Sequence, residues 1–263
     1  MEEICEKLNH VLQEFHRLGV EKQVDFEKLY LYSIVTHSTA IEGSTVTEIE
    51  NALMFDEGIV PGGRNVTEQL MNLDLKRAYD FVKAWIPQKQ EITVELLRKL
   101  SAMVMRNTGS VYHTALGSFD SSQGDFRLVN VSAGRGGRSY LSYQKIPQRV
   151  EDFCLWLNKA RRSVLEDEAA IYAMSFEAHY RLVSIHPWVD GNGRMCRLLT
   201  NLLQMERNLL PSVVRKEDKA KYIEALAASQ EAEDSNVFVS FMLKALMAFV
   251  TQSIEEYGRA WGV

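Results

Sequence analysis

Apolar side chains recur at helical spacing along most of this chain, and the pattern is interrupted only between Gly109 and Pro147. One face of the first helical stretch carries Leu8, Val11, Leu12 and Phe15. Within the interruption, glycines cluster among valine, tyrosine and phenylalanine residues, a texture typical of short strands joined by a turn. We therefore expect an all-α fold with a single β-hairpin.

Further helices are expected where the apolar period resumes. Thr47, Thr67 and Thr93 are suited to cap the helices that follow them, because a threonine oxygen can accept a free backbone N–H. The expected helices span residues 29–41, 48–55, 68–85, 93–105, 150–160, 166–185, 194–208, 217–229 and 237–257. The strands of the hairpin are expected at Phe126–Ser132 and Ser139–Tyr143.

Composition places the chain among ordinary soluble globular proteins. Of its 263 residues, 46% are hydrophobic and 25% are charged, and the net charge of −5 argues against a broad nucleic-acid-binding surface. The acidic amino terminus lacks an apolar leader, and no run of about 18 apolar residues indicates a membrane span. Neither a disulfide framework nor a zinc site is indicated by the separated Cys5, Cys154 and Cys196. We expect a cytoplasmic protein with no membrane or nucleic-acid partner.

Residues with functional side chains are concentrated in the segment from His186 to Arg197. Its sequence is His-Pro-Trp-Val-Asp-Gly-Asn-Gly-Arg-Met-Cys-Arg. Pro187 cannot continue a helix, so His186 is expected at a turn. An imidazole held there can accept a proton near neutral pH.

The residues after this histidine are suited to a polyphosphate. Gly191 to Gly193 precede a new helix, and the free N–H groups of such a turn bind phosphate oxygens. Asp190 can hold a magnesium ion whose other ligands come from the phosphates. Arg194 and Arg197 can neutralise phosphate charge. Each element alone is commonly structural, but a core gains nothing from two adjacent buried cations, so the combination favours a site.

This stretch resembles the signature of Fic-domain proteins, His-Pro-Phe-x-Asp-Gly-Asn-Gly-Arg-x-x-Arg. It departs from that signature only at Trp188, an aromatic residue in the place of phenylalanine. The resemblance implies a Fic-like helical bundle with a β-hairpin flap over the active site. It also implies transfer of AMP from ATP to a Ser, Thr or Tyr side chain of a target protein, with release of pyrophosphate.

The resemblance assigns a role to each residue of the stretch. His186 would be the base that takes the hydroxyl proton, and Asp190 would hold Mg²⁺ or Mn²⁺. The ATP phosphates would be bound by Gly191, Asn192, Gly193, Arg194 and Arg197. Further along, Tyr222 resembles a residue that borders the adenosine pocket in relatives, although the same pattern is typical of core packing. His179 is more typical of a packed or hydrogen-bonded histidine than of a metal ligand.

A flap is expected at about residues 126–143, because Gly124 to Arg127 followed by Val129 to Gly134 resembles that element of the family. In relatives its free edge aligns an extended target peptide by strand addition. The resemblance therefore assigns target docking to Val129, Asn130, Val131 and Ser132. The positively charged turn Gly134–Arg138 could meet an acidic target or the nucleotide. A surface hairpin without function is the alternative.

A second short motif, Ser-Thr-Ala-Ile-Glu-Gly, lies upstream at Ser38 to Gly43. On a helix Ser38 and Glu42 share one face, and the helix dipole mildly disfavours a carboxylate at a C-terminus unless it has a cationic partner. The segment resembles the Ser/Thr-x-x-x-Glu-Gly/Asn inhibitory motif of Fic proteins that carry it in an amino-terminal helix, here about 27–42. The resemblance implies that Glu42 pairs with Arg197 and occupies the space needed by the ATP γ-phosphate.

We therefore expect a single Fic-type unit over residues 1–263, with an amino-terminal helical part at 1–108 and a catalytic core at 109–263. The leading hypothesis is AMP transfer restrained by Glu42. One alternative is Glu42-dependent removal of AMP from a modified protein, and another is a nucleotide-sensing or protein-binding module without turnover. The sequence leaves open the target, the modified side chain and the oligomeric state.

Overall fold

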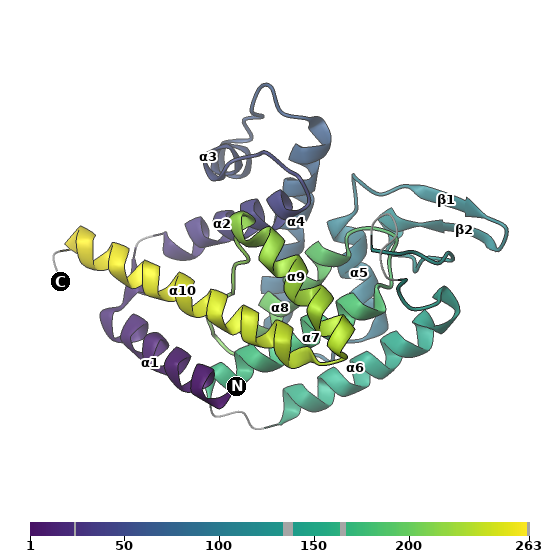
Figure 1. The fold of residues 1–263 in the computed structure, drawn as a ribbon. Coiled ribbons are helices and arrows are strands. Elements are labelled where there is room, and N and C mark those ends of the chain that lie inside the picture. Colours follow the sequence, from purple (N-terminus) through teal and green to yellow (C-terminus); the bar gives the residue numbers. More distant parts are fainter. Residues whose placement is uncertain (24, 134–138, 164–166, 262–263) are drawn as a thin grey trace.

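A computed structural model describes residues 1–23, 25–133, 139–163 and 167–261 (Figure 1). The expected all-α architecture is confirmed: helices dominate, and the β-hairpin lies in the long segment between residues 104 and 146. The helices are α1 (Glu2–Leu18), α2 (Phe26–Ile41), α3 (Glu48–Ala52), α4 (Val66–Trp85), α5 (Val94–Val104), α6 (Ile146–Arg162), α7 (Glu168–Ile185), α8 (Asn192–Met205), α9 (Lys219–Ala232) and α10 (Ser235–Trp261). The strands are β1 (Val111–Thr114) and β2 (Gly117–Asp120).

The centre of the fold is α8, which is buried along most of its length and contacts α2, α4, α5 and α7. Two hydrophobic clusters surround it. One lies among α2, α4, α5, α6 and α8, and the other among α1, α7, α9 and α10. Helix α7 belongs to both, since Leu182 packs in the first cluster and Phe176 in the second. The loop from α7 to α8 is therefore fixed at both ends by buried helices.

The expected positions of the two strands are wrong. The hairpin is formed by β1 and β2, which pair antiparallel with Tyr112 opposite Phe119, and it extends away from the helices (Figure 1). Its two-residue loop, Ala115-Leu116, lacks the Asn-Gly or Asp-Gly signal that marks tight hairpins. The cue that pointed to residues 126–143 was the glycine-rich composition there, which does not by itself specify strand pairing.

In the described part of 126–143, the backbone forms only an isolated antiparallel bridge between Ser132 and Ser139, and the N–H of Tyr140 donates to the Val131 carbonyl over 3.0 Å. Regular pairing fails because other donors take the carbonyls: the Arg127 guanidinium binds those of Val129 and Leu141. The turn Gly134–Arg138 lies outside the described residues. We keep the name flap for residues 126–143.

Two of the three threonine caps predicted from the sequence are present. Thr47 accepts from the Glu50 N–H in a capping box, and Thr93 accepts from the Leu96 N–H. The exception is α4, where Asn65 rather than Thr67 is the cap: its side chain accepts the Thr67 N–H over 2.8 Å. Asparagine is the stronger capping residue, and it starts the helix two residues early.

Helix α10 is long and apolar enough, by length and composition, to cross a membrane, and a third of its most apolar window is buried. Polar residues interrupt its sequence, so it contains no continuous apolar run of about 18 residues. In the structure α10 packs on α1, α7 and α9, with Phe238, Leu243 and Val250 fully buried, so core packing accounts for much of its apolar character. The absence of a membrane partner stays a prediction.

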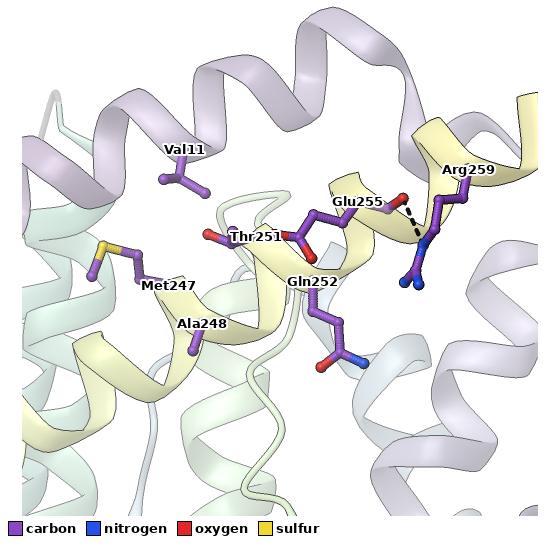
Figure 2. Close-up of a pocket in the computed structure, with 7 residues that line it drawn as sticks. All are labelled: Val11, Met247, Ala248, Thr251, Gln252, Glu255 and Arg259. Carbon is purple, nitrogen blue, oxygen red and sulfur yellow. Dashed lines mark hydrogen bonds between the residues drawn. The ribbon is translucent and has the colours of Figure 1, made fainter. Parts of the chain in front are cut away.

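A surface hollow of about 550 Å³ lies between α1 and the C-terminal half of α10 (Figure 2). Along α10, Arg259 turns back to donate to the Glu255 carbonyl over 3.4 Å. The hollow is lined by Val11, Met247, Ala248, Thr251, Gln252, Glu255 and Arg259. None of these residues belongs to the site predicted from the sequence, which lies at the α7–α8 loop.

Candidate active site

The histidine predicted as a base sits at the end of α7 in a constrained backbone. Residue His186 has φ 51° and ψ 60°, the left-handed region, and its N–H closes the helix on the Leu182 carbonyl over 3.1 Å. Such a conformation is uncommon for a residue with a Cβ. Pro187 follows and prevents the helix from continuing, as the sequence predicted. His186 therefore lies at the turn that ends α7, as expected.

The imidazole of His186 is half-buried and contacts the flap. The ring of Tyr140 stacks on it, with centroids 3.8 Å apart and planes 18° apart. Burial, and next the positive charge of Arg127, lower the pKa of His186 to about 4, against smaller opposing effects of the Val183 carbonyl and of Asp190. The ring is therefore neutral near pH 7 and able to accept a proton.

The glycine turn is shaped by close contacts. Gly191 is the N-terminal cap of α8 with φ 78°, and a Cβ there would lie 2.7 Å from the Met105 sulfur. Asn192 does not offer its side chain to an anion: its Oδ1 accepts from the Trp188 N–H over 3.2 Å and its Nδ2 donates to the Trp188 carbonyl over 2.8 Å. The first N–H groups of α8 have no intrahelical acceptor, so they remain the donors for an anion.

The predicted metal ligand Asp190 has an exposed carboxylate beside this turn. One oxygen accepts the Gly191 N–H over 2.6 Å, and the other lies 3.6 Å from Arg194. Within the described residues no group of three His, Cys, Asp or Glu side chains could hold a metal ion. A single carboxylate fits Mg²⁺ only when substrate phosphates and water complete its shell, which is the usual arrangement in nucleotide sites.

The first arginine of α8 is buried with unsatisfied donors. Arg194 is 2% exposed, and its Nη2 lies 3.2 Å from the Met105 sulfur, a weak acceptor. Its Nε and Nη1 are buried and have no hydrogen-bond partner among the described residues. Burial lowers the pKa of this guanidinium. Buried donors without partners are costly, and these two nitrogens have donors left to bind an anion.

The second arginine is paired with Glu42 and Ser38. Arg197, 5% exposed, donates from Nη2 to Glu42 Oε1 over 2.6 Å, from Nε to Ser38 Oγ over 2.8 Å, and from Nη2 to the Ser38 carbonyl over 2.9 Å. The predicted contact between Glu42 and Arg197 is present. A Cβ on Gly193 would lie 2.7 Å from the same Glu42 oxygen, so the carboxylate also lies against the glycine turn.

Burial alone would raise the pKa of Glu42, but the charge and hydrogen bond of Arg197, joined by Arg194, outweigh it and leave the pKa below its usual value. Glu42 is therefore ionised near neutral pH. A carboxylate in this position presents the same charge and the same acceptor atoms as a phosphate oxygen.

A buried polar network fixes the backbone on both sides of Glu42. Asn72 of α4 lies with its Oδ1 2.8 Å from Thr39 Oγ1, and its Nδ2 donates to Ser44 Oγ over 3.0 Å. Asn51 adds a bond to Asn72 Oδ1 over 2.9 Å. The sequence reading missed this network, whose only local signal is two asparagines within apolar helical patterns.

Tyr222 and His179 form a second buried polar group beside Arg197. The Tyr222 oxygen lies 2.7 Å from His179 Nε2, and His179 Nδ1 lies 3.2 Å from Thr200 Oγ1. His179 is thus packed and hydrogen-bonded as expected, and burial lowers its pKa to about 3. Tyr222 is 3% exposed, and the centre of its ring lies 5.9 Å from the Arg197 guanidinium carbon. Its nucleotide contact stays a prediction.

The residues expected to dock a target lie in the flap, but they are held by side chains more than by strand pairing. The Val129 carbonyl accepts from Arg127 over 2.6 Å, and Asn130 Oδ1 accepts the Tyr143 N–H over 3.1 Å. Val131 and Ser132 take part in the irregular pairing described above. Two neighbours of the site, Arg127 and Tyr140, were not singled out from the sequence.

Comparison with known proteins agrees with this geometry. Residues 91–204 match the model of the Fic/DOC family. The chain carries a Fic domain. The matched segment contains the flap, His186, the glycine turn and both arginines of α8, so the site described above lies within the part of the chain that matches the family.

A curated relative, the protein adenylyltransferase Fic of Drosophila erecta, is 30% identical over 224 residues. The match covers 84% of this chain and 40% of the relative, so the chain spans less than half of that protein's length. A Fic domain containing signaling protein from Bacteroides thetaiotaomicron shares the fold with a TM-score of 0.77 at 20% identity, covering 95% of this chain and 96% of the other. Fic-1 from C. elegans (aa 134–508) also gives 0.77, at 22% identity, covering 98% of this chain and 74% of that one.

Proposed function

We propose that this protein transfers AMP from ATP to the hydroxyl of a Ser, Thr or Tyr side chain on a target protein and releases pyrophosphate. Support comes from the site and from the activity named for the Drosophila relative. A neutral imidazole, an anion-binding helix start and a buried arginine with free donors lie together at the α7–α8 loop. These are the parts needed for transfer of a phosphate-linked group.

In the proposed reaction the α-phosphate of ATP lies on the glycine turn, and Arg194 and Arg197 bind the outer phosphates. His186 removes the proton from the target hydroxyl as that oxygen bonds to the α-phosphorus. The bond between this phosphorus and the oxygen bridging to the β-phosphate breaks, and pyrophosphate leaves with the electron pair. When bound at Asp190, Mg²⁺ or Mn²⁺ would neutralise charge on the phosphates. The products are an AMP ester of the target, pyrophosphate and a proton.

Autoinhibition by Glu42 is the second part of the proposal. The observation that carries it is the 2.6 Å contact between Glu42 Oε1 and Arg197 Nη2, with the same oxygen against Gly193. A guanidinium already paired with a carboxylate cannot make the same bonds to a phosphate. ATP must therefore displace Glu42 or bind with its outer phosphates misplaced.

The test is AMP transfer from labelled ATP by Glu42→Gly, with the protein itself as acceptor. Labelling should rise about tenfold or more, which corresponds to about 1.4 kcal/mol of competition removed. Adding His186→Ala should abolish it. Glu27→Gly is the matched control, because it introduces glycine into the same helix at a residue 3.8 Å from Lys83 and remote from Arg197.

Unchanged labelling in Glu42→Gly with Mg²⁺ and with Mn²⁺ would contradict autoinhibition. Calorimetry then separates the remaining explanations. Tight ATP binding by Glu42→Gly without transfer would favour a nucleotide-sensing or protein-binding module, whereas no binding would contradict the nucleotide site itself.

A second function, removal of AMP, is favoured by the position of the Glu42 carboxylate beside Gly193, where it could orient a water molecule toward the α-phosphorus. Self-modified Glu42→Gly protein can serve as the substrate for wild-type protein. Release of AMP by wild type but not by Glu42→Gln would make Glu42 a catalytic residue of hydrolysis. We further propose a cytoplasmic location, with ATP and a target protein as partners.

A further inference from the structure

Arg127 is a fully buried cation whose hydrogen-bond partners among the described residues include no carboxylate, and it joins the flap to the backbone of His186. Its side chain is 0% exposed. Its Nε donates to the His186 carbonyl over 2.8 Å, its Nη1 to the Val129 carbonyl over 2.6 Å, and its Nη2 to the Leu141 carbonyl over 2.6 Å. Its own backbone N–H donates to the Pro187 carbonyl over 3.1 Å. Arg127 thus joins the two limbs of the flap, one containing Val129 and the other Leu141, to the turn that holds His186.

These bonds explain why a cation is tolerated here. Burying a charge is costly unless it is well hydrogen-bonded, and bonds from a charged donor are stronger than those between neutral groups. The planar guanidinium holds its donors in fixed directions, so it can reach three carbonyls from different segments at once. A lysine has one nitrogen and cannot span the same three acceptors.

The consequence of this arrangement reaches the reacting group through Tyr140. Leu141, whose carbonyl binds Arg127, directly follows Tyr140, and Tyr140 stacks on the His186 ring at 3.8 Å. His186 is therefore held at two points. Arg127 donates to its backbone carbonyl, and the Tyr140 ring lies against the face of its imidazole. Both depend on the same guanidinium.

We propose that Arg127 is a positioning residue: it ties both limbs of the flap to the backbone of His186, keeps Tyr140 stacked on the imidazole, and so orients the base toward a hydroxyl brought in along the flap. The proposal rests on the proposed function for the meaning of that orientation. It assigns Arg127 no contact with ATP, because its described bonds all go to backbone carbonyls of the flap and the turn.

The first experiment needs no turnover. In a spectrum of protein with ¹³C-labelled histidine, the Hε1 proton of His186, assigned through His186→Gln, should be shifted upfield by the stacked Tyr140 ring. Arg127→Met should move this resonance toward the value of an unstacked histidine. Arg127→Lys should not restore the upfield shift, because lysine carries the same charge but cannot bond to all three carbonyls.

The second experiment measures AMP transfer in the Glu42→Gly background. Arg127→Met should lower the rate at saturating ATP about 100-fold, the size expected when a reacting group is displaced by about 1 Å. The KM for ATP should stay unchanged. The control is Arg98→Met, which removes another arginine of the same region, one that donates to the Gly124 carbonyl and pairs with Asp125 without touching His186. It should leave both the resonance and the rate unchanged.

A variant that spares the buried arginine guards against misfolding. Tyr140→Leu removes the stack alone and should reproduce the loss of shift and of rate, whereas Tyr140→Phe should retain both. An upfield resonance that persists in Arg127→Met, or an equal loss in Arg98→Met, would overturn the proposal. If Glu42→Gly transfers no AMP at all, the proposed function fails, and the resonance still decides whether Arg127 positions His186.

Discussion

Two buried arginines lie near the α7–α8 turn, and their hydrogen-bond partners differ in kind. Arg197 is held by a side-chain carboxylate and a serine, whereas Arg127 is held by three backbone carbonyls. An anion can replace a carboxylate at Arg197 with little change elsewhere. An anion that displaced the carbonyls from Arg127 would break the bonds that hold the flap in its conformation. The same side chain is thus suited to exchange of partners in one region and to fixed positioning in the other.

The largest expected effect concerns the exchangeable arginine. In the Glu42→Gly background, Arg197→Met should lower AMP transfer about 10²- to 10³-fold, because a preorganised charge on the reacting phosphates is lost. The rate of transfer from labelled ATP measures this. Transfer that survives in this double variant would show that Arg197 does not bind the nucleotide and would remove the reason for its pairing with Glu42.

A double-mutant cycle tests whether the two arginines are independent. The coupling between Glu42→Gln and Arg197→Met in the free energy of unfolding should be about 1–3 kcal/mol, as expected for side chains in direct contact. The coupling between Glu42→Gln and Arg127→Met should stay within about 0.5 kcal/mol, since these residues share no hydrogen-bond partner in the described part of the chain. Urea unfolding measures all variants. Equal coupling in both cycles would contradict the division into two regions.

The pair with Glu42 should also depend on pH. The pKa of Glu42 is lower in the folded protein than its usual value of 4.5. The stability from this carboxylate is therefore present above about pH 4.5 and is lost as pH falls through the lower folded pKa. The difference in free energy of unfolding between wild type and Glu42→Gln, about 1 kcal/mol near neutral pH, should vanish in acid. A difference that grows as pH falls would contradict the predicted charge of Glu42.

The smallest effect is expected where this chain departs from the Fic signature. Trp188 is fully buried and donates its ring N–H to the Gly124 carbonyl over 3.2 Å. Trp188→Phe removes that bond, but Arg98 still donates to the same carbonyl. The loss in free energy of unfolding should be about 1 kcal/mol plus a small packing term, with AMP transfer in the Glu42→Gly background nearly unchanged. A loss of transfer as large as that of Arg127→Met would assign Trp188 a part in orienting the base.

The sequence predicted the parts of this molecule that depend on neighbouring residues. The helices follow from apolar spacing, the turn at His186 from Pro187, and the cap at Thr47 from its own segment. The contact between Glu42 and Arg197 spans most of the chain, and only the resemblance to a known family placed those two residues together.

What the sequence did not predict depends on partners distant in the chain. The flap fails to form regular strands because the guanidinium of Arg127 takes its carbonyls, and no local pattern announces that. Likewise, the hydrogen bonds by which Asn72 holds the backbone around Glu42 are recognisable only from the packing of α2, α3 and α4 in the structure. Hairpin β1–β2 was missed because its loop carries no strong turn residues.

Two hydrogen bonds to Asn72 hold the backbone around Glu42, and they determine how fast the contact between Glu42 and Arg197 can break. Thr39 and Ser44, one on each side of Glu42, both bind Asn72, so the backbone between them is held in place. Release of the Glu42 carboxylate from Arg197 then requires only rotation about the side-chain bonds of Glu42, not unwinding of α2. Side-chain rotations are faster than helix rearrangements, which take microseconds or longer. The restraint would follow the ATP concentration without delay, as a fast equilibrium rather than a slow structural transition.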